Sequence, residues 1–498
     1  MYIAVRRFCF FLAFAACLVG CGKQAEPSAY LFFTSDIEGV FWSRPEPRYG
    51  NEMTGGLSVL KAFLDKQTVP FLLLDGGNWF AQTPEGTLSQ GAYFNTVAAS
   101  LPYSGRLFTE KDLLYGWTSL SQIIEKSPFP FILSNVTVNG QIPAGAKPWL
   151  IVSVGKYRIG VLGVVGRDAV RGKRRIGGLK VDDEISAIKR TVRILREQNI
   201  QAVVLLSALG SSDKETALTD ATLAQEVEGI DVILSSNLGR DAAETQKVGS
   251  TLIVYPGSKL DGVGRVSLFF NKNGVLEDSR FDDIALYRRD FGEDFAIAEQ
   301  TASVRRAARS QMNRPAGKLE RELTGELDGE SSLGNWTADC LRRWAKADAA
   351  IINSDSLRAS LPKGTVTQYD LYKTYPYADH IMFLDIKGAA LRRALEEGLS
   401  VPHNFAQISG LSIVYDPSAS AGRRIRSVAV NGAPLASKTA YRVAITDQML
   451  AGGAGHDGFI DSLEFKNTQV EVRTVLALCL AGKPHVPSPF SGRWRKTP

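Results

Sequence analysis

Histidine is missing from most of this chain of 498 residues. All four histidines lie in the last quarter, and the first of them is His380. Because several imidazoles usually hold a pair of transition-metal ions, this absence excludes a histidine-ligated metal centre in the first 379 residues. Gly-x-Ser-x-Gly, P-loop and Cys-x-x-Cys patterns are also missing, so the usual signals of a serine hydrolase, a P-loop NTPase and a thiol oxidoreductase are lacking.

The chain has no concentrated charge of one sign. It carries 58 Lys and Arg against 52 Asp and Glu, a formal net charge of +6. The basic residues are dispersed, and no Lys/Arg run has aromatic residues between its members. A nucleic-acid partner is therefore not expected.

One apolar run stands out, at the N-terminus. Arg6 and Arg7 precede the uncharged segment 8–20, which is too short to span a membrane and predicts a secretory signal peptide at 1–20. The segment ends in Leu-Val-Gly before Cys21, which resembles a bacterial lipobox. That resemblance implies a lipid on Cys21, a tether at 21–29, and a place in a bacterial cell envelope, at the outer membrane facing the periplasm. An ordinary signal peptide followed by a chance cysteine is the alternative.

Few cysteines remain after such processing. Cys340 and Cys479 are then the only thiols. An oxidising compartment permits a disulfide between them, and two buried free cysteines fit the sequence equally well.

The rest of the chain divides into two predicted α/β units. Short apolar runs separated by loops and helical patterns predict a layered α/β domain over 30–285, with ligand loops at the carboxyl ends of its strands. Residues 286–318 are rich in Arg, Ala, Glu and Gln and predict a linker helix. Residues 319–498 predict a second α/β unit, with helices at 335–346 and 388–397 and strands at 349–353, 411–415, 427–430 and 441–446.

A series of short motifs in the second unit points to a known family. They include Glu-Ser-Ser-Leu-Gly-Asn at 330–335, Tyr-Pro-Tyr at 375–377, Phe-Ala-Gln-Ile-Ser-Gly-Leu at 405–411 and Asp-Gly-Phe at 457–459. Their order resembles the 5'-nucleotidase and UDP-sugar hydrolase family of secreted metallophosphatases. The resemblance implies a metallophosphatase-like layered sandwich followed by an α/β domain of the 5'-nucleotidase C-terminal type.

The first unit departs from that family at its metal-binding loops. The family's Asp-x-His is Asp36-Ile37-Glu38 here, and Asn78 stands at the place of the bridging Asp. The Gly-Asn-His-Glu loop aligns with Thr-Glu-Lys-Asp at 109–112, which puts Lys111 at the catalytic His. The two remaining His-bearing loops align with Ala-Leu-Gly at 208–210 and Ser-Asn-Leu-Gly at 236–239.

These replacements predict that two-metal chemistry is lost. A pair of dications needs a bridging carboxylate and further ligands on each ion, so no cofactor is expected, or at most one divalent cation bound through oxygen atoms of Asp36, Glu38, Asn78 and Asp112. Solvated loop acids without a metal are the alternative. Lys111 is expected either to fill the vacated cavity through an ion pair with Asp36 or Glu38, or, in an active enzyme that also uses Asp112, to stabilise phosphoryl charge.

The family's nucleotide pocket is partly kept. The resemblance assigns ligand binding to Asn353, Arg358, Phe405 and Asp457, and Arg supplies a planar fork for phosphate. The glycines expected between Asn353 and Arg358 are Ser, Asp and Ser at 354–356. Core packing of Phe405 and an interdomain ion pair of Arg358 are the alternatives.

Three functions fit these observations. The first is an envelope lipoprotein that has lost hydrolysis and binds a nucleotide-like ligand or a protein partner. The second is an active phosphoesterase for nucleotides or UDP-sugars with a rebuilt carboxylate site. The third is a partner of a respiratory or envelope complex that uses a cleft lined by tryptophans (Trp42, Trp79 and Trp117), although core packing explains such residues more often.

Overall fold

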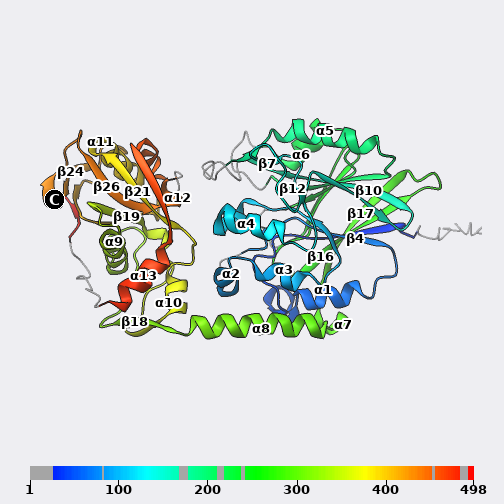
Figure 1. Ribbon diagram of the computed structural model, residues 1–498, viewed down its shortest axis with the longest axis horizontal. Helices are drawn as coiled ribbons and strands as arrows, with labels where there is room; N and C mark the ends of the chain where they lie inside the picture. Colours follow the sequence, from blue (N-terminus) through cyan, green and yellow to red (C-terminus); the bar gives the residue numbers. More distant parts are fainter. Residues whose placement is uncertain are drawn as a thin grey trace, which may run out of the picture.

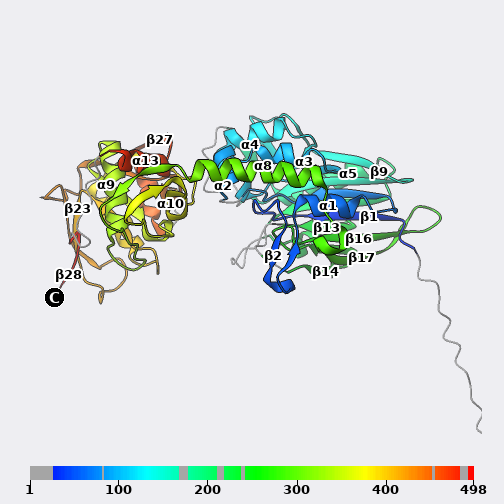
Figure 2. The same ribbon diagram turned by 90° about the horizontal axis from the view of Figure 1, so that it is seen from below.

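The computed structural model describes residues 26–80, 83–167, 178–209, 218–236, 240, 242–450, 455–482 and 492–497. The signal segment and Cys21 lie outside these residues. Two α/β parts lie side by side and are joined by a long helix that runs along the lower edge of Figure 1. Figure 2 shows the same helix from below, crossing from one part to the other. No helix among the described residues is long and apolar enough to cross a membrane.

The N-terminal part is built on two facing sheets. The first has the order β17-β16-β1-β4-β5-β6-β8 and the second β14-β15-β13-β12-β10-β9. Apolar side chains of both sheets form one core, in which Leu31, Phe33, Val204 and Leu234 are fully buried. The strands of the first sheet are β1 (Ala29–Thr34), β4 (Phe71–Asp75), β5 (Tyr103–Arg106), β6 (Phe131–Ile132), β8 (Ala146–Lys147), β16 (Gly262–Phe270) and β17 (Leu276–Ala285). Those of the second are β9 (Trp149–Val154), β10 (Tyr157–Val165), β12 (Ala202–Ala208), β13 (Val232–Ser235), β14 (Glu244–Val248) and β15 (Thr251–Tyr255).

Helices cover the outer faces of both sheets. Their apolar side chains recur at helical spacing, so one face of each helix can bury itself against a sheet. Ile188, Val192 and Leu195 of α5, for example, pack on the second sheet in a separate cluster. The helices are α1 (Leu57–Leu64), α2 (Pro84–Ser89), α3 (Tyr93–Ala98), α4 (Gly116–Glu125), α5 (Glu184–Arg196) and α6 (Asp220–Glu226). The layered α/β sandwich is therefore confirmed.

The segment predicted as one linker helix contains more than one element. It holds the short α7 (Arg288–Phe291), the long α8 (Phe295–Met312) and the start of β18 (Pro315–Leu319). Asp294 caps α8, because its side chain accepts a hydrogen bond from the backbone N–H of Ile297.

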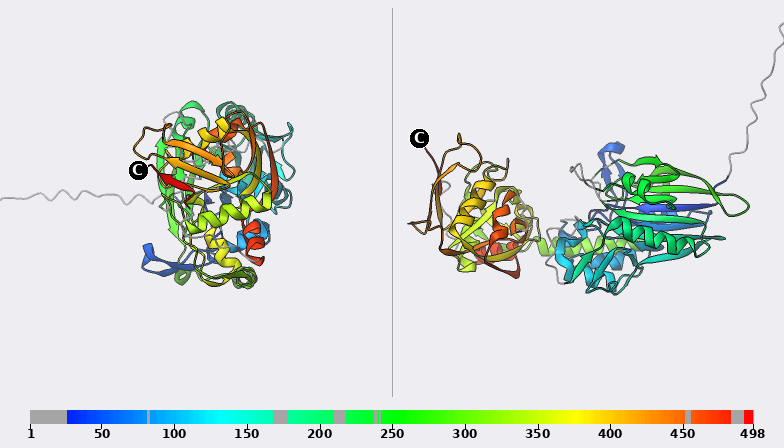
Figure 3. Two further views of the ribbon diagram at one scale, coloured as in Figure 1. Left: turned by 90° about the vertical axis from the view of Figure 1, so that its left-hand side faces the viewer. Right: turned by 90° about the horizontal axis from the view of Figure 1, so that it is seen from above.

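The C-terminal part combines a mixed sheet with flanking helices and a smaller sheet, and the left view of Figure 3 shows this part facing the viewer. The sheet orders are β22-β19-β26-β21-β27 and β25-β24-β23-β28. The strands are β19 (Ala349–Asn353), β20 (Gly364–Thr367), β21 (His380–Lys387), β22 (Ala406–Ser409), β23 (Leu411–Tyr415), β24 (Ile425–Val430), β25 (Ala433–Pro434), β26 (Ala440–Thr446), β27 (Glu464–Glu471) and β28 (Trp494–Lys496). The helices are α9 (Ser332–Ala345), α10 (Gln368–Thr374), α11 (Gly388–Gly398), α12 (Asp447–Leu450) and α13 (Val472–Ala481).

A disulfide joins two helices of this part. Cys340 of α9 and Cys479 of α13 are bonded, with their Cα atoms 5.9 Å apart. The sequence left this pairing open, because nothing in it shows that the two helices pack together. The bond closes a large loop and is expected to restrict the unfolded chain.

Candidate functional site

The candidate site lies where the parallel strands of both sheets end. The loop after β1 carries Asp36 and Glu38, and the loop after β4 carries Asn78. The two sheets meet here, because the hydroxyl of Ser236, which follows β13, donates to the carbonyl oxygen of Gly76 at 2.8 Å. The fold therefore brings the loops that carry the predicted site residues to one edge of the sandwich.

Backbone hydrogen bonds fix these loops in strained conformations. Asp36, Glu38, Asn78, Lys259 and Leu260 all have positive φ, between 49° and 60°. The backbone N–H of Asp36 donates to Gly77 and that of Glu38 donates to Asn78, each at 3.0 Å, and Lys259 donates to Asp36 at 2.8 Å. Residues held in this region of φ cluster at functional sites, so the loop framework of a site is present.

Gly77 shows how tightly the framework is packed. Its φ is 91°, and an added Cβ would lie 2.9 Å from the carbonyl oxygen of Leu107 and 3.0 Å from a carboxylate oxygen of Asp112. A side chain at position 77 would be excluded on both grounds. The close approach brings the loop after β4 against the segment that follows β5.

The carboxylate of Asp112 is used by the fold. Its oxygens accept hydrogen bonds from the backbone N–H groups of Asn78 at 2.7 Å, Trp79 at 2.9 Å and Thr109 at 2.8 Å. The last of these belongs to a capping box at the start of a 3-10 helix, Glu110–Tyr115. Asp112 is 1% exposed, and its lone pairs are directed at the protein backbone rather than at a ligand.

The side chains of Asp36 and Asn78 are hydrogen-bonded to each other. The amide nitrogen of Asn78 donates to a carboxylate oxygen of Asp36 at 2.6 Å, and both residues are fully buried. An Asp at position 78 could not make this contact without placing two carboxylates together. The amide oxygen of Asn78 has no hydrogen-bond partner among the described residues, so it is one buried acceptor at this edge.

Lys111 lies at the outside of the same cluster. Its ammonium group is 3.5 Å from a carboxylate oxygen of Glu38, with the two side chains 45% and 27% exposed. The ion pair between Lys111 and Glu38, one of the two arrangements expected from the sequence, is therefore present. It places a cation beside the acid that aligns with a metal ligand of the related family.

A buried arginine was missed by the sequence analysis. Arg106, the last residue of β5, is fully buried and stacks over the rings of Trp79 at 3.8 Å and Phe131 at 4.6 Å. Its guanidinium nitrogen lies 3.9 Å from Asp112. The signal in the sequence was weak, because one Arg at the end of an apolar strand does not reveal which acids the fold brings to it.

Asp75 is the second missed residue. It accepts hydrogen bonds from the hydroxyl of Thr34 at 2.7 Å and the N–H of Gly77 at 2.8 Å. Burial raises the pKa of Asp75 to about 7, against the opposing attraction of Arg106. Arg106 thus supplies a fixed positive charge beneath the loops, between the carboxylates of Asp75 and Asp112.

The carboxylates at this edge do not fit the pair of metal ions that the resemblance implies. Asp112 is engaged by backbone N–H groups, Asp36 by Asn78, and Glu38 by Lys111. Within the described residues, no three His, Cys, Asp or Glu side chains are grouped so that they could hold one ion. Ala208, at the end of β12, offers no donor atom. Positions 210 and 237–239, which the sequence analysis assigned to the other family loops, lie outside the described residues.

The ligand residues predicted in the C-terminal part lie on two loops. Asn353 is buried, and its side-chain oxygen accepts a hydrogen bond from Ser356 at 2.7 Å. Arg358 is 52% exposed and donates to Asp355 at 2.6 Å within the same loop. Asp457 begins a 3-10 helix, Asp457–Asp461, and its side chain lies outside what the structure describes.

Phe405 belongs to the core of the C-terminal part. It is 8% exposed, and its ring centroid lies 4.8 Å from Trp494 of β28 and 6.2 Å from Tyr415 of β23. His456 is also fully buried, and its ring nitrogen lies 2.9 Å from the carbonyl oxygen of Ala394 in α11. Phe405 is core because it packs against β23 and β28, two strands that the fold brings to it.

The tryptophans do not form a common cleft. Trp79 is fully buried and contacts Phe41, Phe94 and Tyr103. The expectation that it lines an exposed rim is wrong, because the loop after β4 turns inward. Trp42 is half-buried under the guanidinium of Arg305, at 4.2 Å, and Trp117 is also half-buried.

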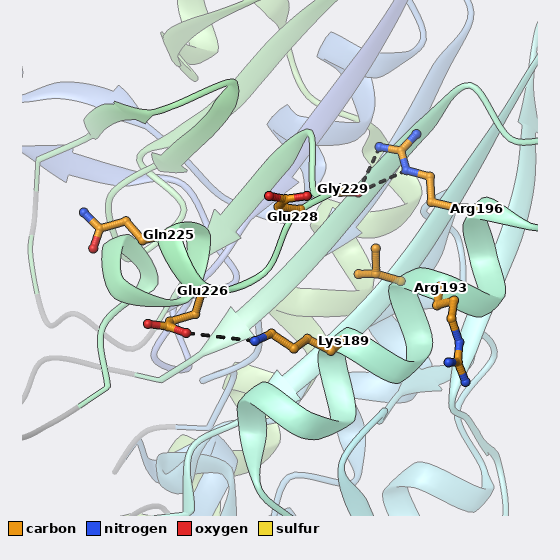
Figure 4. Close-up of a pocket in the computed structure, with 8 residues that line it drawn as sticks. Lys189, Arg193, Arg196, Gln225, Glu226, Glu228 and Gly229 are labelled. Carbon is orange, nitrogen blue, oxygen red and sulfur yellow. Dashed lines mark hydrogen bonds and ion pairs between the residues drawn. The ribbon is translucent and has the colours of Figure 1, made fainter.

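A surface groove lies apart from this site, between α5 and α6 (Figure 4). Its volume is about 660 Å³, and Lys189, Arg196, Glu226 and Gly229 line it. Arg196 donates to the carbonyl oxygen of Gly229 at 2.8 Å, and Lys189 lies 3.9 Å from Glu226. The groove lies at the helices that cover the second sheet and contains none of the residues of the loops after β1 and β4, so it is not part of the candidate site.

Known proteins resemble this chain over most of its length. Residues 312–461 match the family model of the 5'-nucleotidase C-terminal domain. A trifunctional nucleotide phosphoesterase of Bacillus subtilis is 23% identical over 78% of this chain, although the match spans 30% of that protein. Human 5'-nucleotidase is 22% identical over 79% of this chain and 76% of its own length.

Solved structures show the same fold. The 5'-nucleotidase precursor of Thermus thermophilus superposes with a TM-score of 0.65 and 22% identity, over 94% of this chain and 99% of that one. The NAD nucleotidase of Haemophilus influenzae gives a TM-score of 0.57 and 16% identity over the same share of this chain. At these identities the likeness concerns the fold and leaves the chemistry of the site open.

Proposed function

We propose that this chain, which belongs to the 5'-nucleotidase family, has given up two-metal hydrolysis and acts by binding. The supporting observation is the contact between the Asn78 amide and the Asp36 carboxylate at 2.6 Å. A neutral amide stands where the carboxylate that bridges two dications would stand, and it is hydrogen-bonded to Asp36, an acid that would be one of their ligands. The competing function is phosphate ester hydrolysis at a rebuilt carboxylate site.

Metal binding decides between these two functions. We expect calorimetric titration of the purified protein with Mn²⁺, Mg²⁺, Ca²⁺ and Zn²⁺ to give no saturable binding at millimolar metal, and nucleotides to remain uncleaved in each metal. A bound ion that disappears in Asp36→Ala but not in Asp348→Ala, together with phosphatase activity, would establish the competing function. Asp348 is a suitable control, because it is an acid of the C-terminal part, far from this site.

The binding function is proposed for the C-terminal part, with a nucleotide-like anion as ligand. Arg358 supports this proposal, since its half-exposed guanidinium presents a planar fork to solvent. Asn353 holds the same loop through Ser356. Equilibrium dialysis with AMP and UDP-glucose tests it: saturable binding should be lost in Arg358→Ala and kept in Arg426→Ala, an equally exposed arginine paired with Asp416. No binding by the unchanged protein would direct the search to an envelope protein partner.

We also propose that a lipid on Cys21 anchors the chain to the outer membrane, facing the periplasm. The apolar run at 8–20 and the small residues before Cys21 support this proposal. Mass spectrometry of the mature N-terminus should find a lipid-modified Cys21, and Cys21→Ser should release the protein from membranes. An unmodified N-terminus would contradict the anchor and leave the proposed binding function standing.

A further inference from the structure

The amino ends of the parallel strands form the end of the N-terminal part opposite the candidate site. The chain enters the fold there, where the N–H of Ser28 donates to Leu268 at 2.8 Å and its hydroxyl accepts from Phe270 at 3.2 Å. The ring of Tyr157 stacks on Phe270 at 4.1 Å. Two turns, 155–156 between β9 and β10 and 271–275 between β16 and β17, therefore flank the entry point, on the side away from the C-terminal part (Figures 1 and 2).

The two turns expose an apolar side chain and two lysines. Val275 is 57% exposed at the tip of its hairpin. Lys272 is exposed in the same turn and Lys156 in the other turn, where it lies 5.3 Å from the ring centroid of Tyr157; neither lysine forms an ion pair with a residue that the structure describes. The acids that follow the second turn are Glu277, which accepts a hydrogen bond from Asn271 at 3.0 Å, and Asp278, which pairs with Arg280. An exposed apolar tip, with an exposed lysine in each turn, is suited to the headgroup region of an anionic lipid surface.

The chain outside the fold is short enough to hold this end near a membrane. Seven peptide units separate Cys21 from Ser28, and fully extended they span at most about 25 Å. From this length and the charges, we infer that the turns at 155–156 and 271–275 rest on an anionic membrane surface, with Lys156 and Lys272 on lipid headgroups and Val275 at the interface. This inference rests on the proposed lipid anchor. It places the site loops and the C-terminal part on the side of the molecule away from the membrane.

A fluorophore at the hairpin tip tests the inference. In the full mature lipoprotein, Val275→Cys provides a unique free thiol, since Cys340 and Cys479 are bonded to each other. The Val275 backbone, whose N–H donates to Asn271 at 3.0 Å, is unaffected by the change. Labelled protein is inserted into phosphatidylcholine vesicles with or without phosphatidylglycerol. Fluorescence quenching by aqueous iodide should fall severalfold when phosphatidylglycerol is present.

Two controls make the result specific. Leu463→Cys, at an apolar position in the C-terminal part that is 54% exposed, should stay equally open to iodide on both vesicles. Reversal of charge in Lys156→Glu and Lys272→Glu should restore quenching at Val275→Cys, since each lysine contributes about a fivefold preference for the anionic surface. Lys363→Glu, an exposed lysine of the C-terminal part, should not.

An absent lipid anchor and a wrong contact surface would give different results. If the lipoprotein does not float with vesicles at all, the anchor is absent. If it floats and iodide reaches the Val275→Cys label equally on both vesicle types, the anchor stands and the inferred contact surface is overturned. Protection that survives reversal of both lysines would also overturn the role assigned to their charges.

Discussion

The two parts of this molecule differ from the proteins that they resemble in different ways. In the N-terminal part the loops keep strained backbone conformations at Asp36, Glu38 and Asn78, while the side chains there bond to one another. In the C-terminal part the family model still matches, over 312–461, yet Phe405 is packed into a core and Arg358 is paired within its own loop. A similar backbone and a similar sequence pattern are thus separate properties, and neither alone establishes what a site does.

The arrangement of charges explains how the loops of the N-terminal part can keep several acids close together. The loops of the candidate site hold several acids close together, and such acids repel one another unless a positive charge compensates them. Here Arg106 lies buried beside Asp112, and Lys111 lies outside beside Glu38. We interpret these two side chains as the compensation, one beneath the loops and one above them.

Removal of Asp112 should have the largest effect. Asp112→Ala deletes the acceptor of three backbone N–H groups and leaves Arg106 buried without its nearest acid, so we expect about 3–5 kcal/mol of lost stability in urea unfolding. Leu113→Met, a neighbouring core change of similar volume, is the control and should cost less than about 1.5 kcal/mol. A cost below that of the control would show that Asp112 is free for ligand.

Substitutions of Phe405 and Arg358 in the C-terminal part should differ in how much stability they cost. Phe405→Ala should cost about 3 kcal/mol, because it opens a cavity between Tyr415 and Trp494. Arg358→Ala should change stability by less than about 0.5 kcal/mol, since its side chain is half-exposed. Thermal unfolding of both variants measures this difference. A stable Phe405→Ala protein that has lost nucleotide binding would instead assign Phe405 to the ligand.

The pH dependence of stability should report on Asp75. Its pKa is raised from 3.8 to about 7 by burial, so the folded protein holds a proton that the unfolded chain releases between about pH 4 and 7. Stability contributed by this group is therefore highest below pH 4 and falls by about 1.4 kcal/mol per pH unit up to pH 7. In Asp75→Asn, the decrease of the unfolding free energy with pH between pH 4 and 7 should be smaller by about 1.4 kcal/mol per pH unit, the value for one proton. An unchanged slope would mean that Asp75 is ionised throughout.

The ion pair between Lys111 and Glu38 should have the smallest effect. Both side chains are partly exposed, so a double-mutant cycle with Lys111→Ala and Glu38→Gln should give a coupling below about 1 kcal/mol. The coupling should weaken further in high salt. A coupling of several kcal/mol would show that this pair, rather than Arg106, is the main compensation for the acids of the site.

The sequence anticipated more of the fold than of the site. Strands such as Ala349–Asn353 and helices such as Gly388–Gly398 were expected within a residue or two, because apolar periodicity is a local property. The grouping of Asp36, Asn78 and Asp112 in one cluster was implied by the family resemblance, and the loops that carry them do meet at the carboxyl edge of the sheet. Arg106 and Asp75 were missed, since their roles arise from contacts between β4 and β5 that no local pattern records.

Residue identity alone excludes histidine-ligated metals from the first 379 residues, and the order of short motifs is enough to reveal the resemblance to a known family. The contacts of the folded chain were needed to learn that Asn78 donates to Asp36, that Asp112 accepts from backbone N–H groups, and that Phe405 is core. The physical reason is that hydrogen-bond partners and burial depend on which surfaces meet, and the meeting of distant segments is a property of the folded chain as a whole.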